Sequence, residues 1–231
     1  MSELSRIDEE AGTWYPVSIS KLEAYLGKYI ESGNGYKNSY VLKKDLAYNL
    51  QYLQFQDRII MDIKLSSVLY TQTIKTIILV SCSIIESILH YSLIISGFHS
   101  ETEWKQKTVF KGNQKKLDGE FVRIDTTIYT KLGKKKLKHK TFDAMIKCAK
   151  SNSIFGSRPH IYEKLEMLRL LRNRVHLQPT EDKFGTDWTT FTTSHLNETY
   201  VVMYSIFTSS LFKPISIEKS YFEYLGKKYG T

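Results

Sequence analysis

A stretch near residue 170 holds the side chains whose types and spacing best suit catalysis. They recur at intervals of three and four residues, as Arg169, Arg172, Asn173 and His176, and a helix would place all four in one polar stripe. Arginine offers forked, permanently charged donors to phosphate oxygens, and histidine exchanges a proton near neutral pH. Such a set can cleave RNA without a metal ion, because the 2′-hydroxyl is a built-in nucleophile that needs only activation and charge stabilisation. The stripe predicts a phosphodiester site.

The same stripe also has a purely structural interpretation. Arginine and histidine near the end of a helix interact favourably with its C-terminal dipole, and charged stripes are usually solvated faces. Another sector of this helix carries Leu168, Leu171 and Val175, with Met167 beside them. These apolar side chains are expected to face the core. Spacing alone leaves catalysis and helix capping both open.

The positive charge of the chain is concentrated in one region. The sequence has 231 residues and a net charge of +9, and residues 101–150 carry 14 basic against 6 acidic residues. A basic surplus of this kind indicates a polyanionic partner. We interpret Lys134, Lys135 and Lys136 either as contacts to an RNA backbone or as a solvated loop. Tyr129 and Phe121 are interpreted either as stacking partners for bases or as packing within a hairpin.

Helical periodicity dominates the rest of the chain, whose length and composition describe one globular domain or a tight pair. We predict one short strand or hairpin at 120–130. We predict helices at about 18–31, 41–66, 69–95, 141–150, 160–177 and 194–211. The predicted fold class is all-α, an up-down helical bundle with a small β-hairpin insertion. The longest apolar run, 77–96, is interrupted by Glu86 and His90, which a bilayer would penalise, so we interpret it as a core helix.

Several of these segments together resemble the HEPN superfamily of helical RNases and antiviral or toxin proteins. The resemblance covers about residues 66–212 and rests on Leu-Arg-Leu-Leu-Arg-Asn-Arg-Val-His-Leu at 168–177, Thr-Phe-Asp-Ala-Met-Ile-Lys at 141–147, Ile-Phe-Gly at 154–156 and Ile-Ile-Glu-Ser-Ile-Leu at 84–89. It implies three regions. Helices within 1–65 would pack on a HEPN-like domain at 66–212, which carries a basic insertion at about 101–140, and residues 213–231 would form a C-terminal tail.

The family motif is an arginine, often followed by Asn, Asp or His, with four to six residues between the arginine and a histidine. Arg172 and Asn173 match its start, but only three residues separate Arg172 from His176, one fewer than the usual minimum. Six residues separate Arg169 from His176, which is within the family range. We favour Arg172 because a spacing of four residues places it beside His176 on a helix. Arg169 remains the alternative, as a phosphate-binding residue.

The resemblance implies metal-independent RNA cleavage with no cofactor. His176 would transfer protons, Arg172 would stabilise the phosphorane and Asn173 would orient it, while Arg169 and Arg174 would bind substrate together with Lys134, Lys135 and Lys136. It further implies a toxin or abortive-infection effector that forms a homodimer around the site, with an antitoxin or a nucleotidyltransferase as a possible partner. The alternative is a HEPN-like module that binds RNA or protein without catalysis. A DNA-binding role is disfavoured because we find no helix-turn-helix spacing.

An ionisable pair inside the apolar run needs an explanation, because buried charges are costly unless they are satisfied. Glu86 and His90 either bond to each other or face the polar stripe, and we expect Glu86 to support the site by pairing with Arg172 or Arg169. The two cysteines, Cys82 and Cys148, are expected to be reduced core residues. No metal-binding spacing is present, and the first residues lack a secretory signal pattern, so we expect a cytoplasmic protein without a membrane partner.

Overall fold

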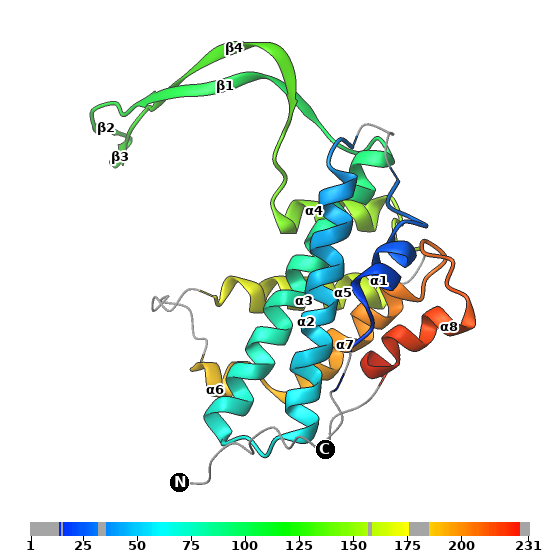
Figure 1. The fold of residues 1–231 in the computed structure, drawn as a ribbon. Coiled ribbons are helices and arrows are strands. Elements are labelled where there is room, and N and C mark those ends of the chain that lie inside the picture. Colours follow the sequence, from blue (N-terminus) through cyan, green and yellow to red (C-terminus); the bar gives the residue numbers. More distant parts are fainter. Residues whose placement is uncertain (1–13, 15, 32–35, 157–158, 176–184, 227–231) are drawn as a thin grey trace.

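The computed structural model describes residues 14, 16–31, 36–156, 159–175 and 185–226. Most of these residues form helices, and a two-stranded β arm projects from the helical part (Figure 1). The elements are α1 (Ile19–Leu26), α2 (Ser39–Asp62), α3 (Ser67–Ile95), β1 (Glu101–Phe110), β2 (Lys115–Leu117), β3 (Glu120–Val122), β4 (Thr126–Leu137), α4 (Phe142–Ser151), α5 (Pro159–Asn173), α6 (Asp187–Thr190), α7 (Thr193–Phe207), α8 (Ser216–Lys219) and the 3₁₀ helix η1 (Ser220–Gly226). A helical fold with a β insertion therefore agrees with the predicted class.

The helix α3 lies at the centre of the bundle and packs against α2, α4, α5 and α7. It has no glycine or proline, and its isoleucines and leucines are mostly buried. Gly97 ends it with φ of 74°, where Gly97 donates its amide to the carbonyl of Ile94 and Phe98 donates to that of Leu93, a Schellman motif. The helix is long and apolar enough to cross a membrane, and 67% of its most apolar window is buried within the bundle.

The helix α5 buries one face and leaves its C-terminal turn open. Leu168 is fully buried and Leu171 nearly so, as predicted, and Leu165 is fully buried as well, whereas Val175 is 45% exposed. The prediction for Val175 was wrong because the helix ends at Asn173. The amide of Val175 then bonds the carbonyl of Arg172, three residues back, and this tighter turn takes Val175 out of the helical sector.

The segment that begins at residue 213, interpreted from sequence as a tail, instead completes the core up to residue 226. It forms α8 and η1, and η1 packs against α7. Phe222 is fully buried and stacks on Phe207, with ring centroids 4.8 Å apart. The hydroxyl of Tyr25 donates to the carbonyl of Phe207, so α1 joins the same aromatic cluster. The segment is short and follows Pro214, and the burial of its apolar residues depends on contact with α7, so the sequence alone did not reveal it.

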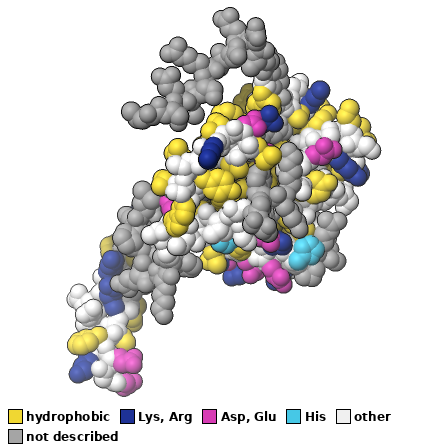
Figure 2. Space-filling model, turned by 90° about the horizontal axis from the view of Figure 1, so that it is seen from below, with side chains coloured by type: hydrophobic (Ala, Val, Ile, Leu, Met, Phe, Trp, Pro, Cys, Tyr) yellow, Lys and Arg dark blue, Asp and Glu magenta, His cyan; other side chains and the backbone are white. Residues whose placement is uncertain are grey.

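The β arm is larger than the strand predicted at 120–130. Its long strands β1 and β4 are antiparallel partners, and β2 and β3 form a second short pair near the tip. Strand β1 was missed because Glu101–Phe110 alternates polar and charged residues without an apolar run. Nearly all arm side chains are exposed, and Figures 1 and 2 show the arm extending away from the helices. A two-stranded ribbon has no core, so backbone hydrogen bonds and cross-strand pairs hold it.

Because the bundle is buried and the arm is exposed, truncation of an aliphatic side chain should lower stability strongly in the bundle and hardly at all in the arm. Leu165→Ala removes a fully buried side chain and should lower the free energy of unfolding by about 2–5 kcal/mol. Ile128 lies on β4 and is 41% exposed, so Ile128→Ala should change the free energy of unfolding by less than about 0.5 kcal/mol. Urea unfolding followed by far-UV circular dichroism measures both. Equal losses in the two variants would contradict an arm outside the cooperative core.

Candidate functional site

The centre of the candidate site is an ion pair between α5 and α3. The guanidinium Nη2 of Arg172 lies 3.2 Å from Oε2 of Glu86, and the side chains are 45% and 24% exposed. Glu86 therefore faces the polar stripe, and its predicted pairing with Arg172 is confirmed. Asn173 follows at the exposed end of α5. The pair thus holds an arginine at the protein surface in one orientation.

The thiol of Cys82 lies beneath this pair. It donates to the carbonyl of Leu168 at 3.5 Å, and burial raises its pKa to about 12, while the charges of Arg172 and Glu86 act on it in opposite directions. Cys82 is a free cysteine in the core, as predicted. Cys148 is also free but only partly buried, with its sulfur 3.8 Å from the ammonium of Lys140. A neutral buried thiol makes Cys82 unreactive.

Arg169 connects α5 to α4 rather than facing open solvent. Its Nε lies 3.2 Å from Oδ1 of Asp143, and only 26% of its side chain is exposed. Lys147, which hydrogen-bonds Asp143, holds the pKa of that carboxyl below its usual value, and Arg169 lowers it further. Arg169 and Arg172 therefore lie in different surroundings, although the sequence places both in one stripe.

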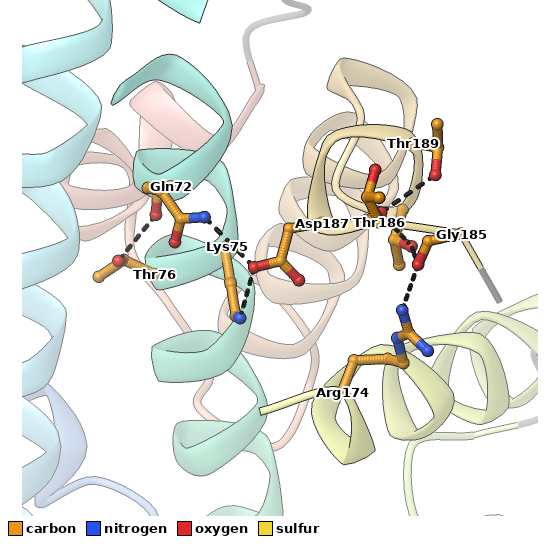
Figure 3. Close-up of polar contacts among 9 residues, drawn as sticks. Gln72, Lys75, Thr76, Arg174, Gly185, Thr186, Asp187 and Thr189 are labelled. Atoms are coloured by element: carbon orange, nitrogen blue, oxygen red, sulfur yellow. Dashed lines mark hydrogen bonds and ion pairs between the residues drawn. The ribbon is translucent and has the colours of Figure 1, made fainter. Parts of the chain in front are cut away.

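Arg174 and Asp187 lie on either side of residues 176–184 in the sequence, and each forms polar contacts with another segment (Figure 3). Arg174 donates from Nη2 to the carbonyl of Gly185, which joins the end of α5 to the residue before Thr186. Asp187 accepts hydrogen bonds from Lys75 at 2.8 Å and from Gln72 at 3.2 Å, both on α3. Lys75 also lies over the ring of Phe191, 5.3 Å from its centroid. His176, the predicted catalytic histidine, lies outside the described residues.

The lysines expected to bind substrate lie on the arm and not beside Arg172. Lys134, Lys135 and Lys136 are exposed on β4, which projects from the bundle, and Lys135 lies 3.2 Å from Glu103. Tyr129 is 54% exposed on the same strand, and Phe121 is 76% exposed on β3. The structure brings together Glu86 and Arg172, but it separates these lysines from them.

The strand pairing also reveals an aromatic residue that the sequence analysis overlooked. Trp104 pairs with Lys131, and Gln106 pairs with Tyr129. Because side chains two residues apart share a face of a strand, Trp104, Tyr129 and Lys131 share one face of the arm. Trp104 is 53% exposed. An exposed indole and phenol beside a lysine provide the groups that stack on bases and contact phosphates.

A pocket on the other side of Glu86 was also missed. It has a volume of about 280 Å³ and is lined by Tyr36, Leu42, Glu86, Ser87, His90, His139, Lys140 and Met145. These residues come from four segments, of which the sequence signalled only Glu86 with His90 and the basic run before α4. Among the described residues, no group of three or more His, Cys, Asp or Glu side chains could hold a metal ion.

Comparisons with known proteins give no independent assignment. No protein-family model matches the chain, and neither a curated protein nor a solved structure is significantly similar to it.

The Asp187 anchor predicts a pH-dependent contribution to stability. Burial acts to raise the pKa of Asp187, but hydrogen bonds from Lys75 and Gln72 and the charges of Lys75 and Arg174 outweigh it, so this pKa lies below its usual value. The ionised carboxylate therefore stabilises the fold above the unfolded pKa near 4, and this contribution disappears as the pH falls through the folded pKa. Asp187→Asn should lower the free energy of unfolding by about 1–3 kcal/mol at neutral pH, because Lys75 is only 10% exposed.

The measurement is urea unfolding of wild type and variant at several pH values between neutral and about 2.5, with the difference between them shrinking below the unfolded pKa. Asp62→Asn is the matched control, because its partner Arg58 is 53% exposed, and it should cost less than about 1 kcal/mol. A loss in Asp187→Asn that does not depend on pH would argue against the ionised anchor.

Proposed function

We propose that the protein is a metal-independent endoribonuclease of the HEPN type, a toxin or abortive-infection effector that acts in the cytoplasm. The observation that carries the proposal is the exposed guanidinium of Arg172, fixed by Glu86 of α3 at the end of α5 and followed by Asn173. His176 is four residues further along the chain than Arg172. Arginine, amide and histidine supply the donors and the proton carrier that cleavage of a phosphodiester requires.

The proposed reaction needs no group beyond these side chains and RNA. The 2′-hydroxyl attacks the adjacent phosphorus as its proton passes to His176, and Arg172 stabilises the charge on the phosphorane oxygens. The bond from phosphorus to the 5′-oxygen then breaks, and that oxygen takes up a proton from the protonated His176, which returns to its neutral form. The products are a 2′,3′-cyclic phosphate and a 5′-hydroxyl. Asn173 would orient the phosphate by hydrogen bonding.

The surroundings of the two arginines support Arg172 as the motif arginine. Arg172 is 45% exposed, whereas Arg169 is 26% exposed and is held by Asp143 between α4 and α5. Arg174, also expected to bind substrate, donates to the carbonyl of Gly185. We therefore assign phosphorane stabilisation to Arg172 and a positioning role to the other two arginines.

A second copy of the chain is the proposed partner at this end of α5. The apolar side chains of Leu170, Val175 and Trp188, on α5, just after it and on α6, are 46%, 45% and 57% exposed. Exposed apolar groups next to polar ones are typical of protein interfaces. In a homodimer of the HEPN type, two such surfaces meet and the sites share one cleft. An antitoxin or a nucleotidyltransferase would be a further protein partner.

One observation favours the alternative, a HEPN-like module that binds RNA without cleaving it. Each of the three arginines near the end of α5 has a partner in the protein: Glu86 for Arg172, Asp143 for Arg169 and the carbonyl of Gly185 for Arg174. Arginines that hold segments of the protein together need not contact substrate. The cleavage test below distinguishes the two functions.

Substitution of the motif residues should abolish cleavage in the presence of EDTA. Purified protein is incubated with tRNA, rRNA and mRNA, and products are resolved by electrophoresis and tested for a 2′,3′-cyclic phosphate. His176→Ala and Arg172→Ala should each lower the rate by at least about a hundredfold, the scale of general acid–base or electrostatic catalysis. Arg123→Ala removes an arginine on the arm and is the matched control, with a rate within about threefold of wild type.

Cleavage that requires added Mg²⁺, or that survives His176→Ala, would exclude the proposed mechanism. RNA binding without turnover, unaffected by His176→Ala, would support the non-catalytic module. Loss of the rate in Arg169→Ala but not in Arg172→Ala would transfer the motif role to Arg169.

The arm lysines should contribute to RNA capture rather than to chemistry. The triple variant Lys134→Ala, Lys135→Ala, Lys136→Ala should weaken binding of single-stranded RNA and lower the slope of log affinity against log salt by about 2, because each neutralised phosphate contributes about 0.7. The triple variant Lys21→Ala, Lys64→Ala, Lys219→Ala removes equal charge from exposed bundle positions. Fluorescence anisotropy at several salt concentrations compares them, and equal slopes in the two variants would exclude a specific role for the arm.

A further inference from the structure

The pocket beside Glu86 is built where three helices and the base of the arm meet. Tyr36 lies just before α2 and Leu42 in its first turn. Glu86 and His90 come from α3 and Met145 from α4, while His139 and Lys140 lie between β4 and α4. Its volume of about 280 Å³ is close to the lower end of the range for small-ligand pockets, roughly 300–1,000 Å³. This is room for one nucleotide rather than for a folded polymer.

The polar lining of the pocket is suited to an anion. Lys140 is half-buried, and within the described part of the chain no carboxylate lies within ion-pair distance of its ammonium. His139 and His90 add two imidazoles. Burial together with the nearby His139 lowers the pKa of His90, although Glu86 acts to raise it, and this favours the neutral ring, which can both donate and accept. Among the described lining residues Glu86 is the only carboxylate, and it is engaged by Arg172. The ammonium of Lys140 contacts the thiol of Cys148 at 3.8 Å, and a lysine beside histidines without a carboxylate partner is a typical phosphate-binding group.

The remaining lining is aromatic and apolar. Tyr36 meets the ring of His90 edge to face, with centroids 6.1 Å apart, and the ring of Tyr91 at 5.2 Å. These contacts fix its ring, so it presents a preformed surface, and Leu42 and Met145 complete the apolar part. A planar base packs well against such a surface.

We propose that this pocket binds one nucleotide, with its phosphate at Lys140 and His139 and its base against Tyr36. The assignment rests on the proposed function, whose RNA substrate supplies the nucleotide. Glu86 lines the pocket on one side and holds Arg172 on the other, so a nucleotide in the pocket adjoins the arginine assigned to the phosphorane. The pocket is therefore the subsite next to the scissile phosphate.

The test uses adenosine 3′-monophosphate, because it contains no diester bond to cleave and reports binding independently of the reaction. Inorganic phosphate and adenosine are titrated separately into the full chain. In NMR spectra of the histidine rings, assigned with His90→Gln and His139→Gln, the nucleotide should shift the signals of His90 and His139. His160, exposed at the start of α5, serves as the internal reference and should not shift.

Opposite charge changes at the pocket should move the affinity in opposite directions. Lys140→Ala should weaken nucleotide binding about tenfold, as expected for loss of a charge-assisted hydrogen bond, and His139→Gln should weaken it severalfold at an exposed position that tolerates substitution. Glu86→Gln should tighten binding, because it removes the only negative charge among the described lining residues. Lys219→Ala, at an exposed bundle position, is the matched control and should stay within about twofold of wild type.

The contribution of the base is read from Tyr36→Leu, which should weaken binding of the nucleotide but not of inorganic phosphate. The proposal is overturned if His90 and His139 do not shift, if Lys140→Ala and Lys219→Ala have equal effects, or if phosphate alone binds as tightly as the nucleotide. RNA cleavage without nucleotide binding here would remove the subsite and leave the proposed function intact. Nucleotide binding without any RNA cleavage would retain the pocket and remove the ribonuclease.

Discussion

Burial of α3 is the constraint on which the arrangement of the site depends. Apolar side chains cover most of this helix, which packs against α2, α4, α5, α6 and α7. An ionisable group buried on it must therefore find a partner or incur a large desolvation cost. Lys75 meets Asp187, and Glu86 meets Arg172. Each pair fixes a separate segment against the same helix, and α3 thereby sets the position of both the end of α5 and the start of α6.

The arm follows a different physical rule. Its strands bury almost no apolar surface, and its side chains interact mainly across the ribbon. Such an element adds little to the free energy of folding, but it carries charge and aromatic rings away from the bundle at little cost to the core. In the proposed function, RNA capture therefore belongs to the arm, which adds little to the free energy of folding. Cleavage belongs to the helical bundle, whose fold depends on buried apolar side chains. Lys140, at the base of the arm, is the point where the basic region reaches the helical bundle.

The sequence predicted what periodicity and local chemistry control. Most helices were placed to within a few residues, and the pairing of Glu86 with Arg172 followed from the cost of a carboxylate in an apolar helix. The buried Phe222 and the exposed Val175 were missed because a helix end and a short 3₁₀ segment depend on tertiary contacts. The pocket was missed because Tyr36 and Lys140 are more than a hundred residues apart in the sequence and meet only through the packing of α2, α3 and α4.

In the proposed reaction, a substrate phosphate meets an Arg172 that is already paired with Glu86. An RNA phosphate must compete with the carboxylate for the guanidinium, and a diester with one negative charge gains little from that exchange. The phosphorane carries more negative charge on its oxygens than the diester, so it competes more strongly for the same donors. Since Arg172 is 45% exposed, it can bond to a second anion without giving up its position on α5. Glu86 thereby holds the guanidinium in position for the state with the most negative charge, and a preorganised donor of this kind stabilises the transition state without reorganisation during the reaction.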